Sequence, residues 1–147
     1  MLEFQTSSEA ETKTLAAKLA KALKPGDCVA FFATLGMGKS VFCRTIIQTL
    51  MPEVSNVPSP TFTLVQTYDN EETEIWHFDL YRLEEPEEVF ELGIDEALQN
   101  SITLIEWPQN MGTYLPSGAI KIYITPGENP DDRLIKIESD KKLLINP

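Results

Sequence analysis

Histidine, cysteine and basic residues are scarce in this chain of 147 residues, which has one histidine, two cysteines, and 12 lysines and arginines against 23 acidic residues. Cys28 and Cys43 lack the spacing of a metal or redox motif, so we expect two small core residues in a reducing compartment. His77 has no second histidine or cysteine near it in the sequence, and we favour a hydrogen-bonded structural role for it over a metal site. The chain offers no serine-histidine-acid or cysteine-histidine arrangement for independent nucleophilic catalysis.

The shortage of positive charge also limits the partners of the chain. A formal net charge of −11 opposes binding to a nucleic-acid backbone through the general field of the protein, so direct RNA binding is disfavoured. A nucleoside triphosphate is also an anion, and binding one here requires local positive groups. Lys39 and the N-terminus of the helix that follows it can serve, with Arg44, Arg82 and Arg133 as further candidates.

Long apolar runs are absent too, and no segment reaches the length of a membrane span. The first residues include Glu3, Glu9 and Glu11 and do not form a basic and then apolar leader, so we expect a cytoplasmic protein without membrane contact. With 42% hydrophobic and 24% charged residues, the chain can form one ordinary core. We expect residues 1–147 to be a single globular domain.

The most informative stretch that is present is ATLGMGKS, from Ala33 to Ser40. It matches the phosphate-binding pattern G-x-x-x-x-G-K-[ST] at Gly38, Lys39 and Ser40, and it has Ala33 where the pattern has its first glycine. The match therefore predicts a nucleotide site with one position altered.

Strand, loop and helix follow one another here in the order that a phosphate loop requires. Residues 28–32 form a short β-prone run typical of a buried parallel strand, and residues 42–50 carry apolar side chains at helical spacing. In such a loop the backbone N–H groups from Gly36 to Ser40 surround a phosphate, Lys39 reaches the outer phosphates, and the Ser40 hydroxyl ligates Mg²⁺. The pattern predicts an α/β fold of the P-loop NTPase type, with a mostly parallel sheet flanked by helices.

Two acidic residues each end an apolar run. Asp79 closes the second arm of a β-hairpin predicted for residues 62–68 and 74–79. Glu106 closes the run 101–106, which has the shape of a Walker-B strand. We favour Glu106 over Asp79 as the Mg²⁺ carboxylate, because the run before it has the character of a central buried strand.

Residues 56–63, which precede the hairpin, combine two prolines with several hydroxyls. Thr61 or Thr63 could sense the γ-phosphate or its Mg²⁺, as in an ordered switch loop, and a rigid connector explains the composition equally well. Trp107 is either core filler or a partly exposed functional aromatic. Both pairs of alternatives stay open.

Helical and acidic segments flank these motifs. Ser8 and Glu11 form the capping box S-x-x-E of an amphipathic helix that ends before Pro25. From residue 84 to residue 96, seven of 13 residues are acidic and are interleaved with apolar residues at helix-compatible spacing. We favour a solvated helix face for this stretch over a docking surface for a basic partner.

The end of the chain predicts an antiparallel addition to the sheet. Residues 119–125 and 133–138 alternate around a turn rich in proline, glycine and aspartate, which is typical of a hairpin. Arg133 begins the second strand of this hairpin and could reach a phosphate, although surface arginines are usually solvated.

In order along residues 8–116, the segments ATLGMGKS, VPSPTFTLV, HFDLYRLEEPEEVFELGIDEAL and LIEWP together resemble the bacterial TsaE (YjeE) family. That family consists of small P-loop ATPases required for threonylcarbamoyladenosine formation on tRNA, which act with partner proteins that carry the transferase chemistry. The resemblance implies ATP and Mg²⁺ as cofactors and a threonylcarbamoyl-transferase complex as the partner.

The resemblance also implies residue roles. Lys39, Asp79 and Glu106 would be catalytic, and Ser40 and Glu106 would ligate the metal. The resemblance places Ser8, Glu11 and Thr12 near the base of the nucleotide. Together with the loop positions and with Arg133, which the residue pattern itself suggests, the residues expected to bind the nucleotide are Ser8, Glu11, Thr12, Leu35, Gly36, Met37, Gly38, Lys39, Ser40, Val41, Thr61 and Arg133. The family loop normally begins with glycine. If this position needs a positive φ, alanine in place of glycine would cost about 1–2 kcal/mol of backbone strain.

The expected function is slow hydrolysis of Mg·ATP, with phosphate occupancy altering contacts with a tRNA-modifying complex. No arginine finger is evident within the loop, so turnover in isolation should be slow. One alternative is a small-molecule kinase, which would need a second pocket for an acceptor hydroxyl. The other alternative is an interaction module that senses nucleotide without hydrolysing it, which the substitution at Ala33 keeps open.

Overall fold

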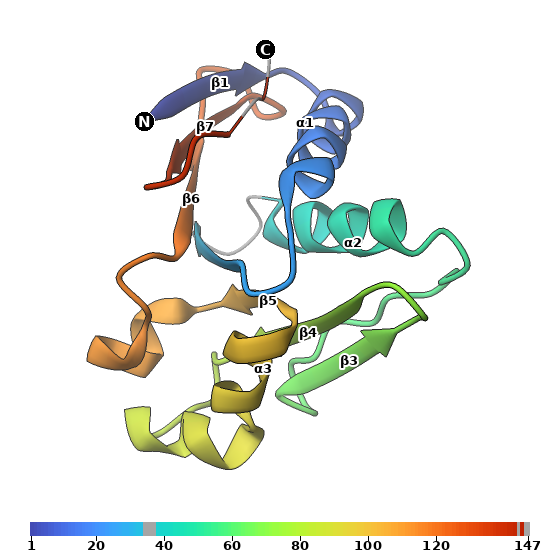
Figure 1. The fold of residues 1–147 in the computed structure, drawn as a ribbon. Helices are drawn as coiled ribbons and strands as arrows, with labels where there is room; N and C mark the ends of the chain where they lie inside the picture. Colours follow the sequence, from blue (N-terminus) through green and yellow to red (C-terminus); the bar gives the residue numbers. More distant parts are fainter. Residues whose placement is uncertain (34–37, 144, 146–147) are drawn as a thin grey trace.

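The computed structural model describes residues 1–33, 38–143 and 145. Its elements, in chain order, are β1 (Leu2–Thr6), α1 (Glu9–Ala22), β2 (Cys28–Ala33), α2 (Lys39–Leu50), β3 (Val65–Asp69), β4 (Glu74–Asp79), the 3-10 helix η1 (Pro86–Leu92), α3 (Ile94–Asn100), β5 (Ile102–Glu106), the 3-10 helix η2 (Pro108–Tyr114), β6 (Ile120–Pro126) and β7 (Arg133–Glu138) (Figure 1). None of the helices formed by these residues has the length and apolar character needed to cross a membrane.

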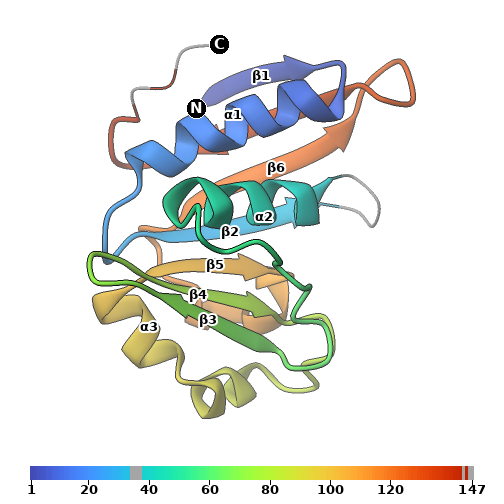
Figure 2. The same ribbon diagram turned by 90° about the vertical axis from the view of Figure 1, so that its right-hand side faces the viewer.

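The strands form one seven-stranded sheet in the order β1-β7-β6-β2-β5-β4-β3 (Figure 2). Its centre is parallel, because β2 pairs with both β5 and β6, and β5 pairs with β4. The edges are antiparallel: β3 returns along β4, β7 returns along β6, and β1 pairs with β7. This arrangement confirms the predicted α/β fold with a parallel core and antiparallel hairpin additions.

Helices cover both faces of the sheet (Figures 1 and 2). On one face, α1 and α2 pack against a hydrophobic cluster that includes Leu19 and Phe42. On the other face, η1, α3 and η2 enclose a smaller cluster that includes Phe78 and Met111. Side chains of the inner strands alternate between the two clusters, as Leu104 and Ile105 of β5 do, because successive side chains of a strand point to opposite faces.

The first strand is an addition that the sequence analysis did not predict. Phe4 and Thr6 in β1 point inward and are buried, while Glu3 and Gln5 are exposed. The short strand pairs along its whole length with β7, which lies more than 100 residues away in the chain. A five-residue strand has little periodicity of its own, so only this distant partner defines it.

Two predicted boundaries were wrong. The hairpin was expected to begin at Phe62, but β3 begins at Val65 because Leu64 has a φ of 68°. The Phe62 ring is 83% exposed instead of packed in the sheet.

The acidic stretch was expected to suit one helix, but Gly93 divides it into η1 and α3 with a φ of 86°. The Trp76 ring comes within 3.0 Å of the position that a Cβ would take at Gly93. A side chain at this position would be both strained and crowded.

The predicted capping box is half correct. Ser8 Oγ accepts a hydrogen bond from the Glu11 backbone N–H at 3.1 Å, which caps α1 as expected. Glu11 Oε1 accepts from the backbone N–H of Ser7 at 3.4 Å, so its return bond goes to the residue before the cap.

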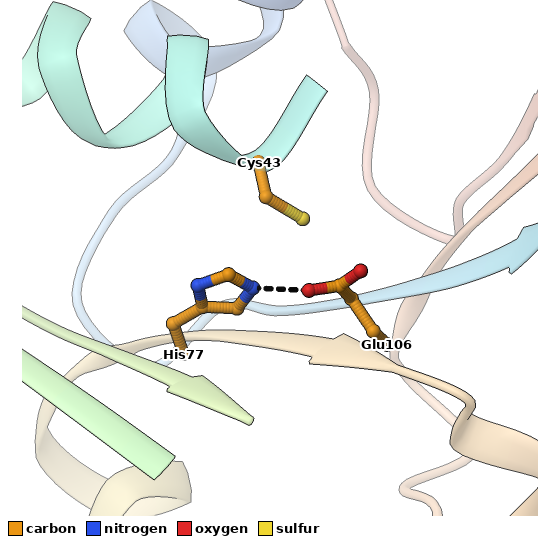
Figure 3. A group of neighbouring side chains, drawn as sticks. All are labelled: Cys43, His77 and Glu106. Carbon is orange, nitrogen blue, oxygen red and sulfur yellow. Dashed lines mark hydrogen bonds and ion pairs between the residues drawn. The ribbon is translucent and has the colours of Figure 1, made fainter. Parts of the chain in front are cut away.

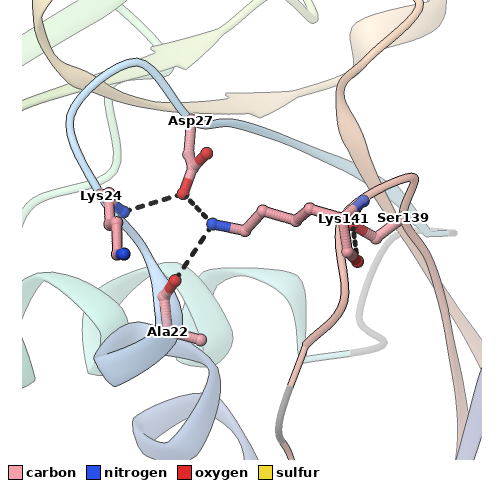
Figure 4. Close-up of polar contacts among 5 residues, drawn as sticks. All are labelled: Ala22, Lys24, Asp27, Ser139 and Lys141. Atoms are coloured by element: carbon pink, nitrogen blue, oxygen red, sulfur yellow. Dashed lines mark hydrogen bonds and ion pairs between the residues drawn. The ribbon is translucent and has the colours of Figure 1, made fainter.

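A charged contact fastens the end of the chain to the turn between α1 and β2 (Figure 4). Lys141 Nζ donates to Asp27 Oδ2 at 2.5 Å and to the backbone carbonyl of Ala22 at 3.1 Å. The same Asp27 oxygen accepts from the backbone N–H of Lys24 at 2.8 Å. This arrangement ties the segment after β7 to the turn that precedes β2, the strand that leads into the phosphate-loop motif.

Candidate functional site

The junction between β2 and α2 contains the end of the phosphate-loop motif. Gly38 is the N-cap of α2 and has a φ of 92°, a conformation that favours glycine. Ala33 is the last residue of β2, pairs with Ile124 of β6, and is not among the residues with positive φ. Ala33 therefore does not need a left-handed backbone, and the energetic cost that such a backbone would bring does not arise. The predicted binding residues Leu35, Gly36 and Met37 lie outside the described residues.

Lys39 is the first residue of α2, and its ammonium group is buried. The residue is 7% exposed, and Nζ has no hydrogen-bond partner among the residues that the structure describes. Nζ lies 4.3 Å from the centre of the Trp107 ring. A cation over an aromatic face gains about 0.5–2 kcal/mol, which does not offset the several kcal/mol of desolvation that a buried ion costs. The ammonium is therefore prepared for an anion.

Trp107 owes its position beneath Lys39 to an unusual backbone conformation. It follows β5 with a φ of 58° and a ψ of 48°, in the left-handed region that bulky residues rarely occupy. The indole is half-buried and also packs against Tyr81, with ring centres 4.9 Å apart. Trp107 therefore combines features of both interpretations, because it packs against the smaller hydrophobic cluster and also contacts the phosphate-loop lysine.

Asp79 and Glu106 lie side by side at the carboxyl ends of two parallel strands. They are register partners across β4 and β5, and they are 5% and 2% exposed. Asp79 Oδ2 accepts a hydrogen bond from Thr61 Oγ1 at 3.1 Å, and Oδ1 accepts from the Tyr81 backbone N–H at 3.0 Å. The segment interpreted as a switch or a connector is thus joined through Thr61 to one of the two candidate carboxylates.

Glu106 is joined to the lone histidine. Its Oε2 lies 2.7 Å from His77 Nε2, and both side chains are buried (Figure 3). This contact agrees with the hydrogen-bonded role predicted for His77. Cys43 of α2 approaches the same pair, so a cysteine does lie near His77 in space, although none does in the sequence.

Charge and burial hold the cysteines in their thiol forms. Burial, followed by the negative charge of Glu106, raises the pKa of Cys43 well above its ordinary value; Lys39 opposes this shift, and Asp79 adds to it. Burial, with a smaller effect of Asp27, raises the pKa of Cys28 to about 12. Both side chains are buried core residues, as predicted.

A pocket of about 230 Å³ lies beside the start of α2 and brings together predicted binding residues from distant segments. The predicted residues that line it are Ser8, Thr12, Gly38, Val41 and Arg133. Glu9 and Asp131 also line this pocket and were not predicted. Glu11, which was predicted, lines a neighbouring groove between β1 and α1.

The remaining positive candidates are placed differently from one another. Arg133 Nη1 donates to the backbone carbonyls of Pro130 and Asp132, which fixes its guanidinium at the rim of the pocket. The Arg82 guanidinium lies over the Phe62 ring at 5.3 Å. Arg44 is exposed on α2 and, with Ser40, lines a small cavity next to Glu106.

Two signals in the sequence could have found the residues that were missed. Glu9 is one residue from the Ser8 cap, and Asp131 lies two residues before Arg133, so both neighbour predicted residues. Cys43 is four residues after Lys39, which places both on the same side of α2. These relations become informative only after β4 and β5 are known to lie beneath that helix.

Comparisons with known proteins agree on one family. The family model described as "Threonylcarbamoyl adenosine biosynthesis protein TsaE" matches residues 6–135. The tRNA threonylcarbamoyladenosine biosynthesis protein TsaE of Rickettsia bellii is 43% identical over 142 residues, covering 95% of this chain and 98% of the relative. The protein of the same name from Bacillus subtilis is 33% identical over 125 residues, covering 84% and 77%. The crystal structure of Bacillus subtilis YdiB superposes with a TM-score of 0.78 at 27% identity, covering 94% of this chain and 84% of that one.

Proposed function

This chain belongs to the TsaE family, and on that premise we propose that it is a cytoplasmic, Mg²⁺-dependent ATPase of low intrinsic turnover. The family acts in the biosynthesis of threonylcarbamoyladenosine in tRNA. The proposed activity supports this modification through a partner protein complex that carries the transferase chemistry. The chain itself contributes nucleotide binding and hydrolysis.

The buried ammonium of Lys39 is the observation that carries the proposal. It is 7% exposed, has no hydrogen-bond partner within the described ranges, and lies at the start of a helix that follows a parallel strand. A phosphate would supply the missing anion, and the N-terminus of α2 would add its own positive end. Trp107 would hold the lysine in place before the nucleotide arrives.

The residues around Lys39 fit a magnesium nucleotide. Ser40 and Glu106 both line a small cavity, and Asp79 is the register partner of Glu106, so a hydroxyl and two carboxylates gather at one edge of the sheet. Oxygen atoms are the ligands that Mg²⁺ prefers, and the metal, when bound, neutralises charge on the phosphates. We assign its first carboxylate to Glu106, as expected from the sequence, and keep Asp79 beside it with Thr61.

The pocket beside Gly38 suits the rest of the nucleotide. Ser8, Thr12 and Val41 supply polar and apolar walls, and Arg133 supplies a positive charge fixed by backbone carbonyls. The pocket volume of about 230 Å³ is below the range of about 300–1,000 Å³ that is typical of ligand pockets, so the ligand would stay partly open to solvent.

Slow turnover follows from what surrounds the two carboxylates. Asp79 already accepts two hydrogen bonds, and Glu106 contacts His77. Because both carboxylates have partners, neither is free to act as a base toward an attacking water molecule. The arginines in the described part of the chain are exposed or held by other contacts, as given above. A partner complex could supply the missing group or reposition the segment that carries Thr61.

Release of inorganic phosphate from Mg·ATP, measured with and without the threonylcarbamoyl-transferase complex, tests the proposal. We expect slow release from the chain alone and faster release with the complex. Absence of hydrolysis in both conditions would overturn the ATPase assignment and leave a nucleotide-sensing module. Transfer of phosphate to an added metabolite would favour a kinase.

A further inference from the structure

Three side chains of different chemistry converge beneath α2. Cys43 comes from α2, His77 from β4 and Glu106 from β5, and the candidate ligand atoms all lie within 4.8 Å of one another. All three residues are buried. Figure 3 shows the Cys43 sulfur pointing from the helix toward the pair formed by the imidazole and the carboxylate. The proposed ATPase function uses only Glu106 of these three.

The combination of donor atoms selects a particular kind of cation. Mg²⁺ binds through oxygen and keeps several waters, so a thiol and an imidazole are poor partners for it. Zn²⁺ binds sulfur, nitrogen and carboxylate oxygen, and a common arrangement has three protein ligands with a fourth position open. Cysteine, histidine and glutamate supply one donor of each type.

Room and charge also suit a divalent ion. His77 and Glu106 line a cavity of about 20 Å³, together with Ser40. A space of about 10–15 Å³ suffices for one water molecule, so the fourth position can be filled by solvent. A thiolate and a carboxylate carry two negative charges, which balance Zn²⁺ in surroundings where an uncompensated charge would be costly.

We propose that Cys43, His77 and Glu106 form a Zn²⁺ site whose fourth position opens to the cavity beside Ser40. Binding displaces the thiol proton of Cys43 to solvent and requires an unprotonated Nε2 on His77, so the ring proton resides on Nδ1. The contact of 2.7 Å between His77 and Glu106 lengthens as both atoms turn to the ion. No bond between heavy atoms of the protein forms or breaks.

The zinc site and the proposed nucleotide site share Glu106. Occupancy by Zn²⁺ withdraws this carboxylate from the magnesium nucleotide, so micromolar zinc would slow ATP hydrolysis. This consequence rests on the proposed function. The binding of Zn²⁺ does not, and it is tested without nucleotide.

The test uses the full chain, stripped of metal with a chelator and titrated with Zn²⁺ or with Co²⁺ as a spectroscopic substitute. We expect one equivalent to bind, and we expect Co²⁺ to give a thiolate-to-cobalt charge-transfer absorption that Zn²⁺ abolishes. A wild-type chain that shows no such absorption, or binds no stoichiometric metal, would overturn the proposal whatever the variants do. Phosphate release would be unaffected by that failure, so the two proposals fail separately.

Variants then assign the ligands. Cys43→Ser and His77→Gln should weaken metal affinity by more than about tenfold. Even mutation of a residue that only hydrogen-bonds to a metal ligand costs about this much affinity, so loss of the ligand itself should cost more. Cys28→Ser is the matched control, because Cys28 is also buried but lies in β2, outside the cluster, and it should bind as the wild type does. Unchanged binding in a folded Cys43→Ser, or loss in Cys28→Ser alone, would contradict the assignment; thermal unfolding of each metal-free variant confirms that it is folded.

Discussion

Replacing Lys39 with methionine should stabilise the nucleotide-free protein while abolishing its response to nucleotide. Methionine has nearly the shape of lysine without the charge, so it fills the same space above Trp107. Burial of an unpaired ammonium costs several kcal/mol, and the contact at 4.3 Å with the indole offsets about 0.5–2 kcal/mol of this. We therefore expect Lys39→Met to raise the free energy of unfolding by about 1–3 kcal/mol. The midpoint temperature of thermal unfolding should rise by about 2–4 °C for each kcal/mol.

Mg·ATP should reverse the order of the two proteins in a thermal unfolding assay. A ligand at about 1,000 times its dissociation constant stabilises the wild type by about 4.1 kcal/mol, which exceeds the expected gain of the variant, and the variant should gain almost nothing from the ligand. Lys142→Met serves as the control, because Lys142 is exposed and should change neither quantity. A nucleotide-free Lys39→Met that is less stable than the wild type would refute the claim that this ammonium waits for an anion.

Other predictions concern the carboxylates, the loop and the thiols. Glu106→Ala should lose Mg²⁺-dependent turnover more than ATP affinity, as measured by calorimetry with and without Mg²⁺, whereas unchanged Mg²⁺ dependence would move the metal role to Asp79. Gly38→Ala should lower the free energy of unfolding by about 1–2 kcal/mol in chemical denaturation, because Gly38 has a φ of 92°. Ala33→Gly should give no gain in stability, since glycine within a strand costs about 0.5–1 kcal/mol. A stabilising Ala33→Gly would show that the alanine is strained. Burial raises the pKa of Cys28 from 9.0 to about 12, so between these values the unfolded chain binds fewer protons than the folded one and stability falls as pH rises, by at most about 1.4 kcal/mol per pH unit. Urea unfolding at pH 9 and above should show a smaller decrease in Cys28→Ala, and an identical slope would contradict this.

Local patterns predicted the elements that carry the chemistry. The strand, loop and helix around Lys39 follow from residues adjacent in the chain, and so do the two strands that end in Asp79 and Glu106. Each has its own hydrophobic period and its own terminating residue, so no knowledge of neighbours is needed. The family resemblance then brought in residues near the pocket, such as Ser8 and Thr12, which no local pattern relates to Lys39.

Features defined by pairing between distant segments could not be predicted in this way. Strand β1 is defined by its pairing with β7, which lies far along the chain. The approach of Cys43 to Glu106 needs the register of β5 beneath α2, and a sequence does not state that register. In each case the decisive energy lies in a tertiary contact and not in the propensity of the segment.

The alternation along β5 has a consequence for how this protein can change during evolution. Ile102 and Leu104 face the cluster beneath α1 and α2, whereas Ile105 faces the opposite cluster, and Glu106 continues the first set at the end of the strand. Insertion of one residue within β5 would turn the carboxylate toward the smaller cluster and place Ile105 in the position that Glu106 occupies, whereas a deletion would place Trp107 there. The length of this strand is therefore more tightly constrained than its composition, since any apolar residue of similar size can replace an isoleucine, but no substitution can repair a lost register.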